Sequence, residues 1–368
     1  MKIIHIIPTL ENGGAERLVQ DICLEINRRK EHEVKLITFQ KNHLKLHDLS
    51  FHTHVDSTYK PSITGFAEIQ IKSLQKIINE FSPNIIHSHL WETEMLLTQV
   101  DIGNAKRFSH FHDNIPQLHK NLLPKNKLQI ADKYERKIYL NRNENNFICI
   151  SNDTYNYAKN ILPKKLKEKI KLIPNAIDYK KLYSNKKKNF DQINLLNIGS
   201  FVPKKNQTFA LKILKELNKR GYVGNLIFLG DGPLQKKIKS QASELDLEKN
   251  VKFKGNVDNI IPFLNSSNIY LHTANYEPFG LVIVEAMAAG LPVISLDGKG
   301  NRDIINNNVN GIIVKDENVD LFVNKIISLF EDQKLYNKFV ENGHITAKKY
   351  DIKTYVDLLI ESYFSAIK

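Results

Sequence analysis

The stretch NYEPFGLVIVEAMAAGLPVIS contains two glutamates, Glu277 and Glu285, in otherwise apolar surroundings. A carboxylate in such a place is costly unless it is paired with a cation or meets a polar ligand. Pro278 and Gly280 interrupt the apolar pattern, so we predict a loop that carries Glu277 and a helix over 281–289 that carries Glu285. Two carboxylates of this kind can accept hydrogen bonds from the hydroxyl groups of a ligand.

The start of this predicted helix adds a second kind of binding group. Backbone N–H groups near Phe279, Gly280 and Leu281 would form an anion site between the two carboxylates. A nucleotide sugar carries hexose hydroxyls, a diphosphate and ribose hydroxyls along its length. The stretch therefore indicates a site for a nucleotide sugar.

Two more glycine-containing loops follow predicted strands. Gly199 ends the strand predicted at 193–200, and Lys204 and Lys205 come next, ahead of a helix, which suits a phosphate. Gly230 follows another apolar run, where a glycine would let the backbone approach a nucleotide. Taken alone, each loop is better explained as a surface turn, with solvated lysines in the first case.

The loop after the first predicted strand contains Gly13 and Gly14, which precede a helical pattern over 15–29. Paired glycines let the backbone approach a ligand and direct helix N–H groups at an anion. The pattern is neither the dinucleotide fingerprint nor a P-loop. A plain tight turn explains it as well.

Three His-x-His pairs stand out: His52 and His54, His87 and His89, and His110 and His112. Alternate residues of a strand share a face, so a metal site is conceivable. No carboxylate or cysteine cluster accompanies the pairs at ligand spacing, so we predict no metal site. Instead we expect some of these histidines to end strands and donate hydrogen bonds to a ligand. His112, followed by Asp113 and Asn114, is the best candidate.

The composition is that of a globular protein with two domains. At 368 residues and 42% hydrophobic content, the chain can bury a sizeable core. No stretch approaches the ~20 apolar residues that span a bilayer, and the N-terminus is typical of a buried strand rather than a signal peptide. Cys23 and Cys149 lie far apart in apolar contexts, so we predict reduced thiols in a cytosolic protein.

The net charge of +13 is concentrated in one region. Residues 117–188 carry 18 Lys and Arg against 6 Asp and Glu. Such a region attracts a polyanion or an anionic membrane surface, although a solvated lysine-rich face is an equal explanation. Nucleic-acid binding is disfavoured, because helix-turn-helix, zinc-finger and RRM signatures are lacking and aromatic residues do not cluster with the lysines.

Strand-like apolar runs alternate with amphipathic helical segments from end to end, which predicts an α/β protein with parallel sheets covered on both faces. We predict strands within 2–8, 32–39, 84–89, 146–151, 170–175, 193–200, 225–232, 251–255, 268–274 and 291–295. The polar, lysine-rich stretch 176–192 suggests a boundary between two doubly wound domains. In such sheets, ligands bind in the loops at the carboxyl ends of the strands.

These motifs together resemble the retaining GT-B glycosyltransferases of the large family-four group. The specific match is Glu277-x7-Glu285 within EPFGLVIVEAMAAGLPVI. Other matches follow in family order along almost the whole chain: GGAERL, HSH, HD, LIPNAID, GSFVPKKNQ, LGDGPL and NGIIV. The resemblance implies two Rossmann-like domains that face a central cleft: an acceptor-side domain over 1–178 and a donor-binding domain over 179–352. A last helix, about 353–368, would pack back on the first domain.

The resemblance also implies roles for residues. Glu277 would contact the donor sugar's hydroxyls, Glu285 the ribose, and Lys205 the diphosphate. The family's companion arginine is Ser200 in this chain, which puts phosphate binding in doubt, although Lys204 lies close enough to substitute.

In the acceptor-side domain, Gly13 and Gly14 match the loop that faces the diphosphate and the acceptor. His112 matches the histidine near the transferred sugar. Glu277, His112 and Lys205 are thus the implied catalytic residues.

The implied reaction moves a hexose, with retention, from a UDP- or GDP-linked sugar to a glycan or lipid-linked acceptor in cell-surface polysaccharide synthesis. No cofactor is expected, and no metal, because the chain contains no Asp-x-Asp. We expect a cytoplasmic protein, with residues 117–188 suited to the inner face of the plasma membrane. A nucleotide-sugar epimerase or a phosphorylase of the same fold is the alternative.

Overall fold

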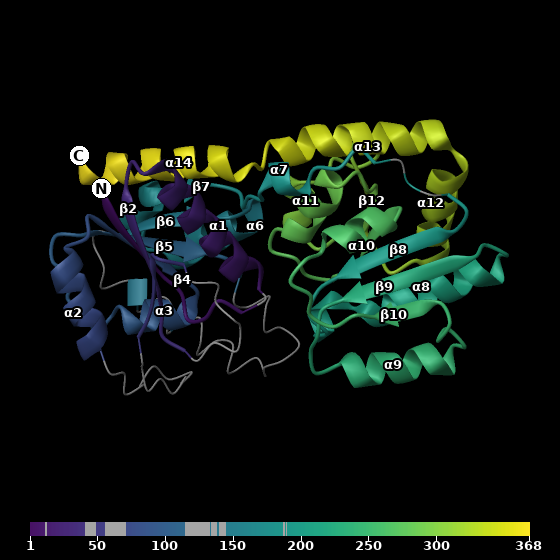
Figure 1. Cartoon of the computed structure of the whole chain (residues 1–368), viewed down its shortest axis with the longest axis horizontal. Helices are drawn as coiled ribbons and strands as arrows, with labels where there is room; N and C mark the ends of the chain where they lie inside the picture. Colours follow the sequence, from purple (N-terminus) through teal and green to yellow (C-terminus); the bar gives the residue numbers. More distant parts are fainter. Residues whose placement is uncertain are drawn as a thin grey trace. The chain divides into compact units, whose positions relative to one another are not determined.

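The computed structural model describes residues 1–11, 13–40, 49–55, 71–114, 133, 138–139, 145–186, 188 and 190–368. The chain divides into two compact units (Figure 1). The first contains Met1–Ala176 and Ile352–Lys368, and the second contains Ile177–Asp351. The division between Ala176 and Ile177 falls in the stretch where the sequence suggested a boundary.

The described part of the first unit contains a sheet of seven parallel strands in the order β3-β2-β1-β4-β5-β6-β7. Its strands are β1 (Lys2–Ile6), β2 (Glu33–Thr38), β3 (His52–His54), β4 (Ile85–His89), β5 (Lys106–Phe111), β6 (Asn145–Cys149) and β7 (Ile170–Leu172). Its helices are α1 (Gly14–Arg29), α2 (Lys72–Phe81), α3 (Trp91–Leu96), α6 (Asn152–Ile161), the short η1 (Lys164–Lys169) and α14 (Ile352–Ile367).

Side-chain alternation decides what each face of this sheet contains. Ile4 and Ile6 of β1 pack in an apolar cluster with Leu74 and Ile78 of α2. Because successive residues of a strand point to opposite faces, His5 lies on the other face. The imidazole of His5 therefore lies on the face of the sheet opposite the one that Ile4 and Ile6 cover.

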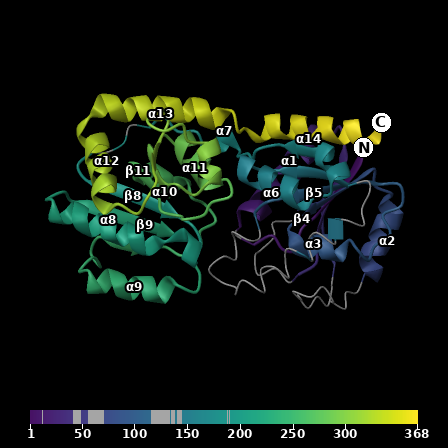
Figure 2. The ribbon, with the colours of Figure 1, turned by 180° about the vertical axis from the view of Figure 1, so that it is seen from behind.

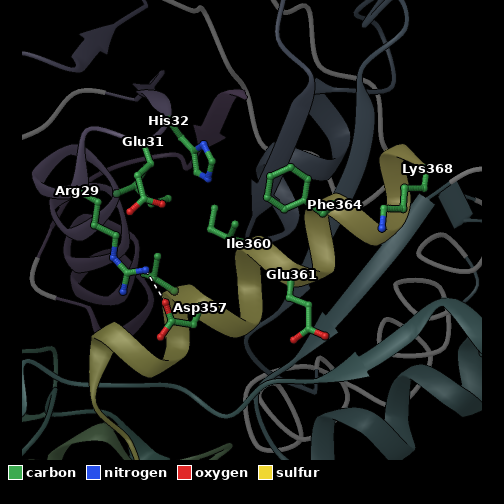
Figure 3. Close-up of a pocket in the computed structure, with 10 residues that line it drawn as sticks. Arg29, Glu31, His32, Asp357, Ile360, Glu361, Phe364 and Lys368 are labelled. Carbon is green, nitrogen blue, oxygen red and sulfur yellow. Dashed lines mark hydrogen bonds and ion pairs between the residues drawn. The ribbon is translucent and has the colours of Figure 1, made fainter.

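The C-terminal helix α14 contacts α1 within the first unit, and the two chain ends lie close together (Figures 1 and 2). Arg29 joins the two helices, with Nη1 2.5 Å from Oδ1 of Asp357 and Nη2 donating to the carbonyl of Lys353 at 2.8 Å. A groove of about 460 Å³ lies beside this ion pair (Figure 3). None of the predicted site residues lines it.

The second unit has a sheet of six parallel strands in the order β10-β9-β8-β11-β12-β13. The strands are β8 (Ile193–Ile198), β9 (Gly224–Leu229), β10 (Val251–Phe253), β11 (Ile269–His272), β12 (Val293–Leu296) and β13 (Ile312–Val314). The helices are α7 (Tyr179–Leu182), η2 (Pro203–Lys205), α8 (Gln207–Lys219), α9 (Gln235–Glu244), α10 (Ile261–Ser266), α11 (Leu281–Ala288), η3 (Gly300–Asp303), α12 (Val319–Glu331) and α13 (Gln333–Lys348).

The strand order reverses between β8 and β11 in the second unit, and between β1 and β4 in the first. With right-handed crossovers, the helices that follow β8 and β11 cover opposite faces of the sheet. The loops at the carboxyl ends of these two strands therefore diverge and leave room for a ligand between them. In the second unit these loops are residues 199–206 and 273–280.

The predicted strands omit β5, whose sequence KRFSHF breaks the apolar pattern with polar residues. The strand is nevertheless buried along most of its length because it pairs with β4 on one side and β6 on the other. Its arginine, Arg107, is accommodated by a buried ion pair of 3.0 Å with Glu94 of α3. Strands β3 and β13 were also outside the prediction.

Both cysteines, Cys23 and Cys149, are free thiols in the core, in the contexts where reduced thiols were predicted. In the described part of the chain, no helix has the length and apolar character that a bilayer crossing requires.

Glu94→Leu should lower the free energy of unfolding by about 3–5 kcal/mol, because it leaves the Arg107 guanidinium buried and uncompensated. The double variant Glu94→Leu/Arg107→Met removes both charges and should regain most of that loss. Urea denaturation of both variants checks this. A double variant no more stable than Glu94→Leu would contradict it.

Candidate active site

The second unit holds a buried ion pair between the two loops that diverge at the strand-order reversal. Lys205 Nζ lies 2.5 Å from Glu277 Oε2, and the two side chains are only 17% and 9% exposed. Lys205 ends η2, after β8, whereas Glu277 lies between β11 and α11. The pair therefore sits at the point of the sheet where a ligand is expected.

Backbone hydrogen bonds hold these two loops together. The Asn275 N–H donates to the Lys204 carbonyl at 2.8 Å. The Thr273 hydroxyl donates to the Lys205 carbonyl at 3.0 Å. These bonds fix the main chain on both sides of the ion pair and so hold the two residues within reach of each other.

The charge state of the pair follows from its surroundings. Burial alone would raise the pKa of Glu277, but the Lys205 ammonium and the His272 ring outweigh it and hold this pKa well below its usual value. His272 Nε2 lies 3.3 Å from Glu277 Oε2. Burial lowers the pKa of His272 despite the nearby carboxylate, so this ring is neutral at pH 7. The site combines a carboxylate, an ammonium and a neutral imidazole.

A third loop, after β12, fixes the backbone of Glu277. The Glu277 N–H donates to the Gly298 carbonyl at 2.8 Å, and the Gly300 N–H donates to the Glu277 carbonyl at 3.0 Å. A Cβ at Gly300 would come within 2.0 Å of the Pro278 carbonyl oxygen, so only glycine fits. The buried Asn301 stabilises this loop by accepting the Gly298 N–H at 3.0 Å.

This third loop lies outside the site residues predicted from the sequence. The closely spaced glycines of DGKGNRD were the available signal.

Helix α11 begins at Leu281, directly after Gly280, whose φ is +107°. The Ile283 N–H donates to the Gly280 carbonyl at 2.9 Å, so the amide groups of Leu281 and Val282 are the ones that helix geometry leaves without an intrahelical acceptor. Glu285 lies within the helix and is 2% exposed. Burial raises the pKa of the Tyr270 hydroxyl, and the charges of Glu277 and Glu285 add to the rise, so this phenol lies near both carboxylates.

The side chain of Phe279 is 1% exposed and packs edge-on against Tyr350, with ring centroids 5.5 Å apart. Its aromatic ring is therefore part of the core. Only its backbone is left to meet a ligand, which is the role that the sequence predicted for Phe279, Gly280 and Leu281.

The loops after β8 and β9 form a surface without side chains beside Lys205. A Cβ at Gly230, where φ is +123°, would lie 2.3 Å from the Gly199 carbonyl oxygen. The methylene chain of Lys205 lies along Gly199. Ser200 is exposed, and its carbonyl accepts a hydrogen bond from Gln207 Nε2 at 3.0 Å.

The predicted residues thus fall into two groups. One group belongs to the second unit: Gly199, Ser200, Lys204, Lys205, Gly230, Glu277, Phe279, Gly280, Leu281 and Glu285. The other group, Gly13, Gly14 and His112, belongs to the first unit.

Gly13 precedes α1, and the carboxylate of Glu16 folds back over it, so that a Cβ at Gly13 would lie 1.9 Å from Glu16 Oε2. Burial raises the pKa of Glu16 to about 7, and the neighbouring Glu11 and Glu92 add to the rise. Glu16 was not among the predicted site residues, although it belongs to the motif GGAERL.

His112 lies in a group of five buried histidines, which we term the histidine cluster: His5, His87, His89, His110 and His112. Nε2 of His112 is 2.9 Å from Nδ1 of His89, and Nδ1 of His5 is 2.9 Å from Nε2 of His89. Burial lowers the pKa of all five rings, so they are neutral at pH 7.

His52 and His54 form a separate pair. They lie on β3, where a ring nitrogen of each is 3.0 Å from the Thr38 hydroxyl. Much of the basic region 117–188 lies outside the described residues. Within its described part, Lys164, Lys165 and Lys167 of η1 are exposed.

Comparison with known proteins agrees with this architecture. The Anabaena protein Alr3699/HepE, solved with UDP-glucose, superposes with a TM-score of 0.82 at 21% identity, over 99% of this chain and 100% of that one. WaaG, a glycosyltransferase involved in lipopolysaccharide biosynthesis, gives a TM-score of 0.75 at 16% identity, over 97% and 98% of the two chains. The fold is the GT-B glycosyltransferase fold.

Sequence comparison identifies the family. The profile of "Glycosyl transferases group 1" matches residues 178–345, and that of "Glycosyltransferase Family 4" matches residues 12–181. Together the two profiles match nearly the whole chain, which therefore belongs to the family-four glycosyltransferases. It is a glycosyltransferase that takes sugar from a nucleotide sugar.

Individual relatives have sequence identities of 26–27%. An uncharacterised glycosyltransferase of Methanocaldococcus jannaschii, MJ1178, is 27% identical over 83% of this chain and 86% of its own length. The capsular polysaccharide biosynthesis glycosyltransferase CapH of Staphylococcus aureus is 26% identical over 83% of each chain. An Escherichia coli α-1,3-galactosyltransferase that uses UDP-Gal and a diphosphoundecaprenol-linked sugar is 26% identical over 52% of this chain and 55% of its own.

Glu277→Gln should lower the free energy of unfolding at pH 7 by about 3 kcal/mol, because it leaves Lys205 buried without its counter-ion. Because the pKa of Glu277 is depressed in the folded protein, the ionised carboxylate contributes fully to the free energy of unfolding above about pH 4.5. This contribution is lost as the pH falls further. The stability difference between wild type and variant should therefore shrink from pH 6 to pH 3. Denaturation curves at the two pH values measure it, and an unchanged difference would contradict the assignment.

Proposed function

We propose that this protein is a retaining hexosyltransferase that moves a hexose from a UDP- or GDP-linked sugar to a hydroxyl of a glycan or lipid-linked acceptor. The observation that carries the proposal is the buried Lys205–Glu277 pair, which lies between the two diverging loops of the second unit. A carboxylate beside an ammonium and a helix N-terminus matches the order of hydroxyls and diphosphate in a nucleotide sugar.

In this proposal Glu277 accepts hydrogen bonds from the hydroxyls of the transferred sugar. Its ionised state suits that role, because a carboxylate is an acceptor at both oxygens. Glu285, one helical turn and a half into α11, accepts from the ribose. The glycine surface at Gly199 and Gly230 lets the donor approach the backbone closely.

Lys205 and the first turn of α11 bind the diphosphate. Negative charge grows on the leaving diphosphate as the glycosidic bond breaks, and a fixed ammonium and fixed amide groups stabilise that charge. Glu277 orients Lys205 before the donor arrives. Lys204 replaces the arginine that the family places where this chain has Ser200.

Retention follows if the acceptor attacks from the face that the diphosphate leaves. The departing phosphate then takes the proton of the attacking hydroxyl, so no protein nucleophile and no metal ion on the diphosphate is required. We propose that His112 and the loop at Gly13 and Gly14 contact the transferred sugar and the acceptor from the first unit.

Relatives support the choice of donor and acceptor. HepE was solved with UDP-glucose, the Escherichia coli relative takes UDP-Gal and a diphosphoundecaprenol-linked sugar, and CapH acts in capsule synthesis. We therefore place this protein in cell-surface polysaccharide synthesis at the cytoplasmic face of the membrane. The exposed lysines of η1 supply charge for contact with an anionic membrane surface.

A panel of UDP-, GDP-, ADP- and dTDP-sugars should identify the donor by thermal shift, because a ligand that binds the folded state raises the melting temperature. With that donor, the product anomer measured by NMR should be the same as the donor anomer.

Glu285→Ala should lower kcat/KM by about 10- to 100-fold, as expected for the loss of hydrogen bonds to a charged group. Glu341→Ala, an exposed acid on α13, is the matched control. Inverted product, or Glu285→Ala with wild-type kcat/KM, would contradict the proposal.

Ser200→Arg should strengthen binding of the nucleoside diphosphate by about tenfold, because Arg supplies charge-assisted hydrogen bonds that a hydroxyl cannot. Ser200 is exposed, so the larger side chain needs no repacking. Isothermal titration with UDP and GDP measures the gain, and Ser200→Ala should change the affinity by less than about twofold. Unchanged affinity in Ser200→Arg would mean that this position does not face the phosphates.

A further inference from the structure

The histidine cluster is unusual because its rings come from three neighbouring strands onto one sheet face. His5 lies on β1 opposite His87 on β4, and His89 lies opposite His110 on β5. The rings of His110 and His112 stack with centroids 4.1 Å apart, and those of His87 and His89 with centroids 4.4 Å apart. Each neutral imidazole has one donor and one acceptor nitrogen to satisfy.

Hydrogen bonds satisfy only part of this set. Within the described residues, four buried nitrogens of the cluster have no hydrogen-bond partner: Nε2 of His87, both nitrogens of His110, and Nδ1 of His112. A buried nitrogen without a partner destabilises the fold. Three of these four nitrogens belong to two residues, His110 and His112, which are neighbours of His89.

We propose that His89, His110 and His112 form a binding site for one divalent transition-metal ion of the zinc type. One ring nitrogen from each of the three lies within 4.8 Å of the corresponding nitrogens of the other two. Tetrahedral zinc with Zn–N of 2.0–2.1 Å places its ligand nitrogens about 3.4 Å apart, so shifts of about 1 Å complete the site. Three histidines without a carboxylate are a known zinc set that keeps a fourth position open.

The rest of the histidine cluster forms the outer shell of this site. His89 Nε2 lies 2.9 Å from His5 Nδ1, and His5 Nε2 lies 3.4 Å from the Tyr363 hydroxyl. That hydroxyl also lies 2.6 Å from His87 Nδ1. If each group donates to the next, from His89 through His5 and Tyr363 to His87, then His89 Nδ1 presents its lone pair to the metal. Such outer partners commonly orient metal-bound histidines.

Besides these small shifts, metal binding requires a change of tautomer at His112. With the same tautomer of His89 and no ion, Nε2 of His112 donates to Nδ1 of His89 across 2.9 Å. With the ion, both nitrogens become ligands and the proton moves to Nδ1 of His112. No proton is lost overall, and the ion ties the end of β4 to the end of β5.

The site shares His112 with the proposed transfer site but includes none of its diphosphate-binding groups. Its ligands belong to the sheet of the first unit, whereas the diphosphate-binding groups Lys205 and Glu277 belong to the second. Metal binding is therefore measured without donor or acceptor, and its failure leaves the proposed function untouched.

The test is titration of the tag-free, chelator-treated full chain with Co²⁺, followed by displacement with Zn²⁺. One equivalent of Co²⁺ should bind and give the intense visible bands of four-coordinate cobalt. His89→Ala and His110→Gln should each weaken binding by at least 100-fold, because the loss of an outer partner alone typically weakens it 10- to 100-fold. Tyr363→Phe should weaken binding about tenfold.

The matched control is the double variant His52→Ala/His54→Ala, which removes a His-x-His pair of the same unit outside the site and should bind as wild type does. Because the His89→Ala or His110→Gln variant can misfold, circular dichroism checks the fold in each titration. The number of Co²⁺ ions bound by the wild-type chain tests the proposal without any variant. Three results would overturn the proposal: folded wild type that binds no Co²⁺, spectra of six-coordinate cobalt only, or His89→Ala and His110→Gln variants that bind Co²⁺ as tightly as the control. The histidine cluster would then be a hydrogen-bonded element of the core.

Discussion

The ion pair between Lys205 and Glu277 is the interaction on which the candidate site depends. Both charges are largely withdrawn from water, and each is tolerated only because the other is 2.5 Å away. Removal of either one would leave an uncompensated charge. In the proposed function, the same contact also orients the Lys205 ammonium toward the diphosphate, so one ion pair would serve both stability and donor binding.

The pair remains in place because three loops hold its backbone. The loop after β8 presents Lys205, the loop after β11 presents Glu277, and the loop after β12 bonds to Glu277 on both sides. Parallel strands bring these carboxyl ends to one edge of the sheet, and the reversal of strand order separates the helices there. The glycines at 230 and 300 allow the loops to approach one another without side chains between them.

Much of this arrangement was predictable from the chain alone. The alternation of apolar strands and amphipathic helices predicted the α/β class, and the spacing of Pro278 and Gly280 placed Glu277 in a loop and Glu285 in a helix, as observed. Strand β5 was missed because polar residues such as Arg107 and His110 interrupt its apolar pattern, and its burial comes only from the neighbouring strands. Lys205 and Glu277 are far apart in sequence, so no local sequence pattern could predict that they pair.

By itself, the sequence determined the fold class, the family and the candidate donor-binding residues, because periodicity and turn residues act over short stretches of chain. Only the tertiary structure decided which side chains meet. It paired Lys205 with Glu277, placed the loop at Gly298 and Gly300 behind them, and gathered five histidines from separate motifs onto one sheet face. The physical reason is strand register: a hydrogen-bonded sheet brings distant residues opposite one another, and the resulting burial sets their charge.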